Sequence, residues 1–128
     1  MALRDRLRVM VVDDMSVSRG LLVNALEGFG ISYVTHERDG QDALKTMLSN
    51  PVHLVISDFN MPNMNGLELL RAIRTNKAIQ KTGFIMVTGS DKAELIQAGK
   101  KLGMNNYLKK PFNESDLRKC VEAVVGKL

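Results

Sequence analysis

The stretch from His53 to Gly66, His-Leu-Val-Ile-Ser-Asp-Phe-Asn-Met-Pro-Asn-Met-Asn-Gly, constrains how the rest of the chain can be arranged. Its short apolar run, Leu54–Ile56, is typical of a strand buried on both faces of a parallel sheet. Asp58 stands just beyond that run, and the Asn, Pro and Gly residues after it predict an irregular loop. Ligands of open α/β sheets bind beyond the carboxyl ends of the strands. We therefore expect Asp58 to be a site residue.

Length and composition are those of one soluble globular domain, which we expect to span residues 1–128. Hydrophobic residues make up 45% of the chain and charged residues 25%, an ordinary balance for such a domain. The longest apolar runs are far too short to cross a bilayer, and the N-terminus lacks the apolar centre of a signal peptide. The single Cys excludes an internal disulfide bond. These features predict a cytoplasmic protein with no membrane segment.

Strand and helix patterns alternate five times along the chain. The predicted strands are Arg8–Val12, Ile31–His36, Val52–Ser57, Phe84–Thr88 and Asn106–Lys109. The predicted helices run from Asp14 or Ser16 to Gly28, then over Gln41–Leu48, Gly66–Arg74, Asp91–Lys101, and from Asn113 or Ser115 to Val125. This alternation predicts an α/β fold, a doubly wound parallel sheet of five strands with five helices.

Apolar residues at helical spacing indicate which face of each helix is buried. In the first helix, with Asp14 or Ser16 as N-cap, this face comprises Val17, Leu21, Leu22, Ala25 and Leu26. In the second it comprises Ala43, Leu44, Met47 and Leu48, and in the third Leu67, Leu70 and Ile73. In the last it comprises Leu117, Cys120, Val121, Val124 and Val125.

Side chains capable of chemistry stand where the predicted strands end. Asp13 and Asp14 follow the first strand, Asp58 the third, Thr88 ends the fourth, and Lys110 follows the fifth. The carboxyl ends of parallel strands share one edge of the sheet, so these side chains should converge. Three carboxylates crowded beside one ammonium cannot all stay ionised unless a cation joins them. An all-oxygen site of this charge suits Mg²⁺, and the absence of nearby His or Cys disfavours zinc.

A carboxylate, an ammonium and a hydroxyl beside a hard cation are the groups that phosphoryl transfer requires. Asp58 would attack as a nucleophile and form an acyl phosphate, while the cation and Lys110 neutralise the phosphoryl oxygens. Thr88 could donate a hydrogen bond to a phosphoryl oxygen only once that group is present, which makes it a candidate sensor. Taken singly, each residue has an ordinary structural explanation, such as helix capping by Asp14. Their placement at four successive strand ends favours a shared site.

Four segments together resemble the receiver domain of two-component response regulators, and within it the single-domain chemotaxis regulators of the CheY type. These segments are Val11–Asp14, Ile56–Gly66, Met86–Thr88 and Tyr107–Phe112, and the likeness covers essentially the whole chain. CheY is itself a standard example of the flavodoxin-like strand order 2-1-3-4-5. That order is therefore implied by the resemblance and does not follow from the residues alone.

The resemblance also implies a role for each residue at the strand ends. It makes Asp58 the phosphoacceptor and Lys110 the partner of the phosphoryl group. Thr88 and Tyr107 would form a coupled switch pair, and the Lys110–Pro111 peptide bond would be cis. The implied ligands of Mg²⁺ are Asp13, Asp14, Asp58 and the backbone carbonyl of Asn60. The residues that depart from the family pattern are Gly89, which follows the switch Thr, and Leu102, Met104 and Asn106, which precede the switch Tyr.

A receiver of this kind would be a signalling switch and not an enzyme acting on other substrates. It would catalyse only its own phosphorylation and dephosphorylation, taking the phosphoryl group from a histidine kinase of the CheA type. As a monomer it would signal by protein contact, with a flagellar motor switch protein or a phosphatase as partner. A phosphate sink, or a single-domain regulator outside chemotaxis, is an alternative that the sequence leaves open.

Other classes of function fit the residues less well. A phosphatase of the haloacid-dehalogenase kind needs a second Asp two residues after its nucleophile, where this chain has Asn60. A flavin-binding module needs a phosphate loop after the first strand, and Asp13 and Asp14 would repel an anion there. Nucleic acid is disfavoured because aromatic residues are only 5% of the chain and the receiver extends to Leu128, which leaves no room for a DNA-binding domain.

The net charge of +4 raises the question of where the excess basic residues lie. We expect many of them on an output surface built from the helix at 91–101, the strand at 106–109 and the helix at 113–125. Its basic residues would be Lys92, Lys100, Lys101, Lys109, Arg118 and Lys119, against the acidic Glu94, Glu114, Asp116 and Glu122. Such a surface would steer an acidic partner. The alternative, that these are scattered solvated charges, stays open.

Overall fold

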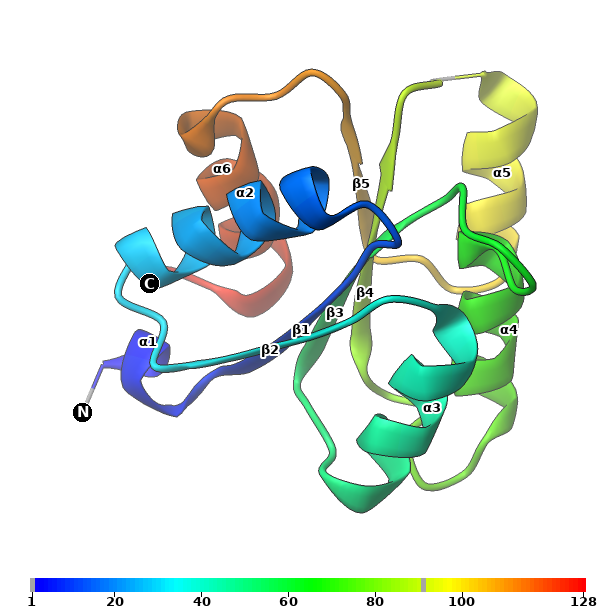
Figure 1. Ribbon diagram of the computed structural model, residues 1–128, viewed down its shortest axis with the longest axis horizontal. Helices are drawn as coiled ribbons and strands as arrows, with labels where there is room; N and C mark the ends of the chain where they lie inside the picture. The colour runs from blue at the N-terminus through cyan, green and yellow to red at the C-terminus, as the bar shows by residue number, and fades with distance from the viewer. Residues whose placement is uncertain (1, 91) are drawn as a thin grey trace.

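Five parallel strands in the order β2-β1-β3-β4-β5 form the centre of the computed structural model, which describes residues 2–90 and 92–128 (Figure 1). The strands are β1 (Arg8–Val12), β2 (Tyr33–Glu37), β3 (Leu54–Asp58), β4 (Gly83–Thr88) and β5 (Asn106–Lys109). The flavodoxin-like order and the doubly wound architecture are confirmed. Each predicted strand is present, with bounds shifted by up to two residues at either end. The central strand ends on Asp58, so the candidate nucleophile belongs to the sheet itself.

Six helices, not five, are present in the described part of the chain. They are α1 (Leu3–Arg6), α2 (Ser16–Gly28), α3 (Gly40–Ser49), α4 (Gly66–Thr75), α5 (Ala93–Lys101) and α6 (Glu114–Val125). The additional helix, α1, is a single turn that carries no fully buried residue, so the sequence offered no apolar stripe to predict it. The predicted helix at 91–101 began at Asp91, which lies outside the described residues.

The two faces of the sheet are covered by different helices. In Figure 1, α2 and α6 lie on one side, and α3, α4 and α5 lie on the other. Neighbouring strand residues alternate between the two resulting cores: Val9 and Val11 pack toward α2 and α6, whereas Met10 and Val12 pack toward the opposite helices. A strand buried on both faces favours apolar residues on both sides, which is why β1 and β3 contain the continuous apolar runs Val9–Val12 and Leu54–Ile56.

The start of α2 differs from the prediction in its capping. Met15 occupies the N-cap position without a side-chain capping bond, and Ser16 is already the first helical residue. The carboxylate of Asp13 accepts a hydrogen bond from the Met15 backbone N–H at 3.0 Å instead. Asp14 remains exposed in the turn, so its carboxylate is not used to cap the helix. The prediction of Asp14 or Ser16 as N-cap is therefore wrong.

The predicted apolar face of α2 is also only half correct. Leu22, Ala25 and Leu26 are buried, but Val17 is 73% exposed and Leu21 is 63% exposed. Those two residues border a groove of about 760 Å³ between α2 and the segment from Lys110 to Glu114. Five apolar residues at 17, 21, 22, 25 and 26 occupy a stripe wider than the part of the helix that contacts the sheet, and its outer edge faces this groove.

Two smaller corrections concern α3 and α4. Leu48, predicted to be buried, is 51% exposed at the end of α3, whereas Met47 is fully buried. In α4 the buried residues include Leu69 in addition to the predicted Leu70 and Ile73, and Leu67 is only partly buried.

The prediction of α6 holds for Leu117, Cys120 and Val121, and Val124 and Val125 pack at the margin of the core. The alternative caps of α6 are resolved in favour of Asn113, whose side chain accepts from the Asp116 N–H.

The loop after Asp58 is closed by a tight approach of two backbone segments. A Cβ on Gly66 would lie 2.8 Å from the carbonyl oxygen of Asp58 and would overlap Met86 Sδ. The Gly66 N–H donates to the Phe59 carbonyl oxygen at 2.8 Å, which returns the chain to the end of β3. Asn65 then caps α4 in a reciprocal arrangement with Glu68. Glycine is required here because any side chain would push the loop away from Asp58.

At the end of the sheet away from Asp58, the side chain of Arg74, near the end of α4, joins several backbone segments, and we call this group of contacts the clasp. Its guanidinium donates to the carbonyl oxygens of Gln80 (2.9 Å), Thr82 (2.6 Å) and Gly103 (3.2 and 2.9 Å) and to Oδ1 of Asn105 (3.0 Å). Desolvation in this partly buried position lowers the pKa of Arg74. The clasp therefore ties the segments that lead into β4 and β5 to α4.

Within residues 2–90 and 92–128, each helix is too short or too polar to cross a membrane.

Candidate functional site

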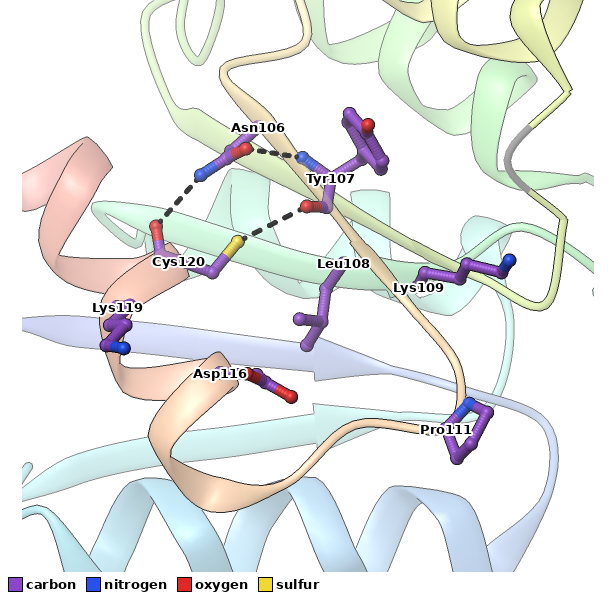
Figure 2. A pocket seen from close by; sticks show the side chains of 8 residues that line it. All are labelled: Asn106, Tyr107, Leu108, Lys109, Pro111, Asp116, Lys119 and Cys120. Carbon is purple, nitrogen blue, oxygen red and sulfur yellow. Dashed lines mark hydrogen bonds between the residues drawn. The ribbon is translucent and has the colours of Figure 1, made fainter.

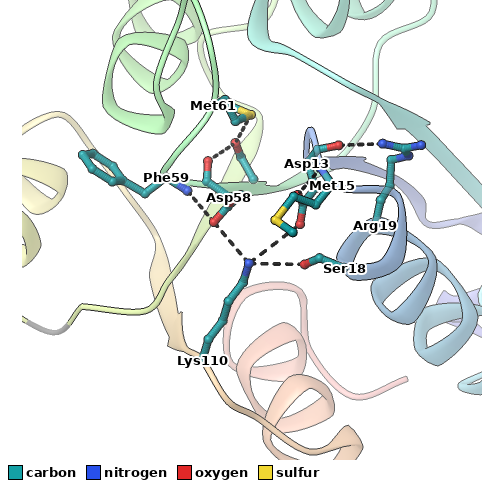
Figure 3. Close-up of polar contacts among 9 residues, drawn as sticks. Asp13, Met15, Ser18, Arg19, Asp58, Phe59, Met61 and Lys110 are labelled. Carbon is teal, nitrogen blue, oxygen red and sulfur yellow. Dashed lines mark hydrogen bonds and ion pairs between the residues drawn. The ribbon is translucent and has the colours of Figure 1, made fainter.

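Three carboxylates meet at the carboxyl edge of β1 and β3. Each of Asp13, Asp14 and Asp58 offers one oxygen, and these three oxygens lie within 4.8 Å of one another. Asp13 directly follows β1, and Asp58 is the last residue of β3, which pairs with β1 in parallel. The expected convergence of the strand ends is thus present in the structure (Figure 3).

Asp13 has an oxygen that no protein group satisfies. Its Oδ1 accepts the Met15 N–H, but its Oδ2 is buried and has no hydrogen-bond partner among the described residues. Buried polar atoms are nearly always paired, so an orphaned carboxylate oxygen calls for a further ligand. An all-oxygen group of three carboxylates fits a hard divalent cation such as Mg²⁺. The residues present therefore match the predicted metal site.

Asp58 has a pKa raised above its ordinary value. Burial is the largest cause, and the neighbouring charge of Asp13 adds to it. The Lys110 ammonium and a 3.0 Å hydrogen bond from the Phe59 N–H to Asp58 Oδ1 act in the opposite direction. The carboxylate is thus costly to ionise in the absence of a further cation, which is the electrostatic signature of a prepared binding site.

Lys110 reaches the carboxylates from the segment that follows β5, the edge strand of the sheet. Its Nζ lies 3.4 Å from Asp58 Oδ1 and 3.9 Å from Asp13 Oδ2, and its side chain is 28% exposed. Its backbone N–H donates to the Thr88 carbonyl oxygen at 2.8 Å, which anchors it beside the end of β4. The peptide bond between Lys110 and Pro111 is cis, as the family resemblance implied.

Thr88 ends β4, the strand that pairs with β3 and its terminal Asp58. Its hydroxyl oxygen accepts a hydrogen bond from the Ser90 N–H at 3.0 Å, and the residue is almost fully buried. Asp58 pairs with Val87 in the sheet, and side chains alternate along a strand. Thr88 therefore falls on the side of α3, α4 and α5, whereas Asp58 falls on the side of α2 and α6.

Tyr107 shares a sheet face with Thr88. It pairs with Met86, two residues before Thr88 in the same strand, so the two side chains are diagonal neighbours on one face. Tyr107 is 36% exposed. Figure 2 shows its ring pointing away from Cys120 and Lys119, which together with Tyr107 line a pocket of about 500 Å³ beside β5.

The model of the response regulator receiver domain family matches residues 9–122. The chain belongs to this family. Its match begins within β1 and ends within α6, and it contains each residue of the carboxylate cluster. Membership assigns the chain to phosphorylation-dependent two-component signalling.

Curated relatives and solved structures of receivers match nearly the full length of the chain. A probable chemotaxis protein CheY of Rhizobium etli is 42% identical over 128 residues, covering 100% of this chain and 99% of its own. A chemotaxis protein CheY homolog of Campylobacter jejuni is 39% identical, covering 94% of this chain and 93% of its own. The chemotaxis response regulator CheY4 of Vibrio cholerae is 32% identical with a TM-score of 0.86, covering 92% of this chain and 98% of that structure.

Two side chains of this receiver site escaped the sequence prediction, and both lie in the first turns of α2. Ser18 Oγ accepts a hydrogen bond from Lys110 Nζ at 3.2 Å, and Arg19 donates to the Asp13 carbonyl oxygen at 2.9 Å (Figure 3). The available signal was their position: a helix that starts two residues after a site carboxylate directs its first turns toward the same edge. The search for apolar periodicity considered only apolar residues, so it passed over Ser18 and Arg19.

Proposed function

We propose that the chain is a CheY-like receiver that accepts a phosphoryl group on Asp58 with Mg²⁺ bound beside it. The observation that supports this most strongly is the orphaned buried oxygen of Asp13, within a cluster of three carboxylates that also faces the Lys110 ammonium. Such a cluster lowers the stability of the metal-free protein, so a structural role alone does not account for it.

Transfer would exchange one phosphorus bond for another. An Asp58 oxygen attacks the phosphorus of a phosphohistidine whose other ring nitrogen is protonated. The new O–P bond forms as the N–P bond breaks, the electron pair of that bond stays on the ring nitrogen, and the imidazole leaves as a neutral group. Lys110 neutralises charge on the phosphoryl oxygens, because its ammonium already lies 3.4 Å from the attacking carboxylate. Hydrolysis later breaks the O–P bond by attack of water, which releases inorganic phosphate and restores the Asp58 carboxylate.

The metal would be held by oxygen atoms alone. The proposed ligands are Asp13, Asp14, Asp58 and the backbone carbonyl of Asn60, which lies two residues beyond Asp58. When bound, Mg²⁺ supplies positive charge that stabilises the phosphoryl oxygens during transfer. Asp13 contributes through a side chain fixed by the Met15 N–H, so its free oxygen is already directed into the site.

The signal would leave through Thr88 and Tyr107. In the unphosphorylated protein the Thr88 hydroxyl oxygen is engaged by the Ser90 N–H. A phosphoryl oxygen on Asp58 would attract the hydroxyl proton of Thr88, and the shift would open space into which Tyr107 turns from its partly exposed position. This is a two-state equilibrium biased by a local change of charge.

The same residues support a switch over an enzyme that acts on other substrates. A phosphatase with an aspartyl nucleophile needs a general acid or base close to that nucleophile. The residue two positions after Asp58 is Asn60, whose amide cannot serve in either role. The receiver would thus catalyse only its own phosphorylation and dephosphorylation, and the acyl phosphate would persist long enough to be read by a partner.

Relatives that are named chemotaxis proteins favour a histidine kinase of the CheA type as phosphoryl donor. A flagellar motor switch protein or a phosphatase would then read the phosphorylated state, with a phosphate sink as the alternative role.

We further propose that residues 1–128 act as a single cytoplasmic receiver domain and that the protein is a monomer. Capture of partners from a cell extract, with and without beryllium fluoride as a phosphoryl mimic, separates a motor target from a kinase-only partner.

The decisive test is labelling of the Asp58→Asn variant. Wild-type protein incubated with a small phosphodonor should gain one phosphoryl group, measured by mass spectrometry, only when Mg²⁺ is present. Asp58→Asn should lose all labelling because an amide is a poor nucleophile, while its circular dichroism stays that of the wild type. Glu27→Gln, an exposed carboxyl on α2, is the matched control and should label normally.

Labelling of Asp58→Asn at the wild-type level would place the phosphoryl group on another residue. Labelling of the wild type in excess chelator would show that the carboxylate cluster does not need a cation.

A further inference from the structure

The shortest polar contact of the Lys110 ammonium in the site is with a neutral group. Lys110 Nζ lies 3.2 Å from Ser18 Oγ, but 3.4 Å from Asp58 Oδ1 and 3.9 Å from Asp13 Oδ2. Figure 3 shows the three contacts fanning out from a single nitrogen atom, with Ser18 on the side of α2. An ammonium has three N–H donors, so one of them is committed to a hydroxyl although two carboxylates lie close by.

Both partners of this contact are held in place by the backbone. Ser18 sits in the first turn of α2, which is attached to the end of β1 at two points: the Met15 N–H donates to Asp13 Oδ1, and Arg19 donates to the Asp13 carbonyl oxygen. Lys110 is attached to the end of β4 through its N–H and the Thr88 carbonyl oxygen. The fold therefore places the Ser18 backbone beside the site carboxylates, within reach of the Lys110 ammonium.

The Lys110 ammonium has an alternative position beside Asp13 Oδ2, which lies 3.9 Å from Nζ. Asp13 Oδ2 is buried and lacks a hydrogen-bond partner, and it attracts any cation within reach. A movement of Lys110 Nζ by about one ångström toward Asp13 would give a direct, charge-assisted hydrogen bond. In that position the ammonium would occupy the oxygen that the proposed metal site needs.

We propose that Ser18 is a positioning residue that holds the Lys110 ammonium away from Asp13 and so keeps the carboxylates free for a divalent cation. The proposal rests on the metal site of the proposed function. The hydroxyl keeps Lys110 near enough to Asp58 to meet an incoming phosphoryl group, yet prevents it from acting as a substitute for the metal.

The test measures Mg²⁺ affinity by isothermal titration calorimetry on metal-free protein. Ser18→Ala should raise the dissociation constant for Mg²⁺ by about three- to tenfold, the effect expected for the loss of one hydrogen bond. Ser18→Thr, which keeps the hydroxyl, should restore the wild-type value. Ser16→Ala, an exposed serine on the same helical turn, is the control and should leave affinity unchanged.

A second comparison separates positioning from a general effect on the fold. In a Lys110→Ala background, adding Ser18→Ala should change Mg²⁺ affinity no further, because the ammonium that Ser18 restrains is gone. Phosphorylation of Ser18→Ala by a small phosphodonor should be slow at low Mg²⁺ and recover at saturating Mg²⁺.

Three outcomes would overturn the inference. If the wild type binds Mg²⁺ and Ser18→Ala binds it equally well, Ser18 has no positioning role. If the effect of Ser18→Ala persists without Lys110, the serine acts by another route. If the wild type does not bind Mg²⁺ at all, the proposed metal site fails and takes the inference with it.

Discussion

Charged side chains are paired in opposite ways at the two ends of the parallel strands. At the end of the sheet where α4 finishes and the chain leads into β4, the Arg74 guanidinium lies among neutral acceptors. Each of its N–H groups donates a hydrogen bond to an oxygen. At the carboxyl edge, Asp13, Asp14 and Asp58 crowd together around one ammonium, and Asp13 Oδ2 has no hydrogen-bond partner in the described residues. The donors of the clasp are all paired, whereas one buried carboxylate oxygen of the site lacks a hydrogen-bond partner among the described residues.

This difference shows where stability and function reside in the same small sheet. The Arg74 clasp contributes to folding and touches none of the residues of the site. The carboxylates reduce stability because like charges repel and one of them is fully buried, and a bound cation would offset that cost. Substitutions at the two ends should therefore change folding stability in opposite directions.

The largest effect is expected at the Arg74 clasp. Arg74→Ala leaves the carbonyl oxygens of Thr82 and Gly103 without their donor, so the free energy of unfolding should fall by about 2–3 kcal/mol. Urea denaturation followed by circular dichroism measures the change. Phosphorylation of Asp58 per folded molecule should be unaffected, because the clasp is remote from the carboxylates.

Arg71→Ala is the matched control, since Arg71 lies one turn earlier on α4 and is exposed. Equal losses of stability in the two variants would mean that the clasp adds nothing beyond the ordinary contribution of a surface arginine.

An opposite and smaller effect is expected for Asp13→Asn. Removing one charge from the cluster should raise the stability of the metal-free protein by about 1 kcal/mol. The same variant should lose most of the stabilisation that millimolar Mg²⁺ confers on the wild type through preferential binding to the folded state. Melting temperatures measured with chelator and with Mg²⁺ give both quantities. An unchanged response to Mg²⁺ would contradict the assignment of Asp13 as a ligand.

The smallest effect concerns the pH dependence of stability in the metal-free protein. The pKa of Asp58 is raised in the folded state, so the folded protein binds that proton more tightly than the unfolded chain does. The unfavourable contribution of Asp58 is absent below its ordinary pKa of 3.8 and grows as pH rises through the raised value. Asp58→Asn should therefore gain stability relative to the wild type as pH increases over this range.

The measurement is the difference in unfolding free energy between the two proteins across that range, in chelator. A difference that does not vary with pH would show that Asp58 titrates alike in folded and unfolded chains.

Sequence reasoning predicted most of the fold because its signals were local. The continuous apolar run of β3 and the alternation of strands and helices determine a parallel sheet, and a parallel sheet brings Asp13 and Asp58 together at one edge. The predicted core face of α2 was wrong at Val17 and Leu21 because periodicity shows that a stripe is apolar but not how far the neighbouring elements cover it. Here the covering stops short, at the groove beside Phe112.

The details of the site depend on contacts that no local pattern contains. The bond between Lys110 and Ser18 joins residues 92 positions apart and requires particular side-chain conformations in both. The direction of Thr88 depends on strand register, since a shift of one residue would turn it toward Asp58. These features are properties of the assembled sheet, and only the structure supplies them.

The environment of Cys120 makes the protein convenient for labelling chemistry. Its thiol is buried on α6, donates to the Tyr107 carbonyl oxygen at 3.5 Å, and has a pKa raised by desolvation to about 11. The thiolate is the species that reacts with maleimides and iodoacetamides, so at neutral pH this cysteine is nearly inert. A second cysteine placed on an exposed residue, such as Lys92, would then carry a spin label or fluorophore alone. Such a label would report on the start of α5 in the protein with its native cysteine retained.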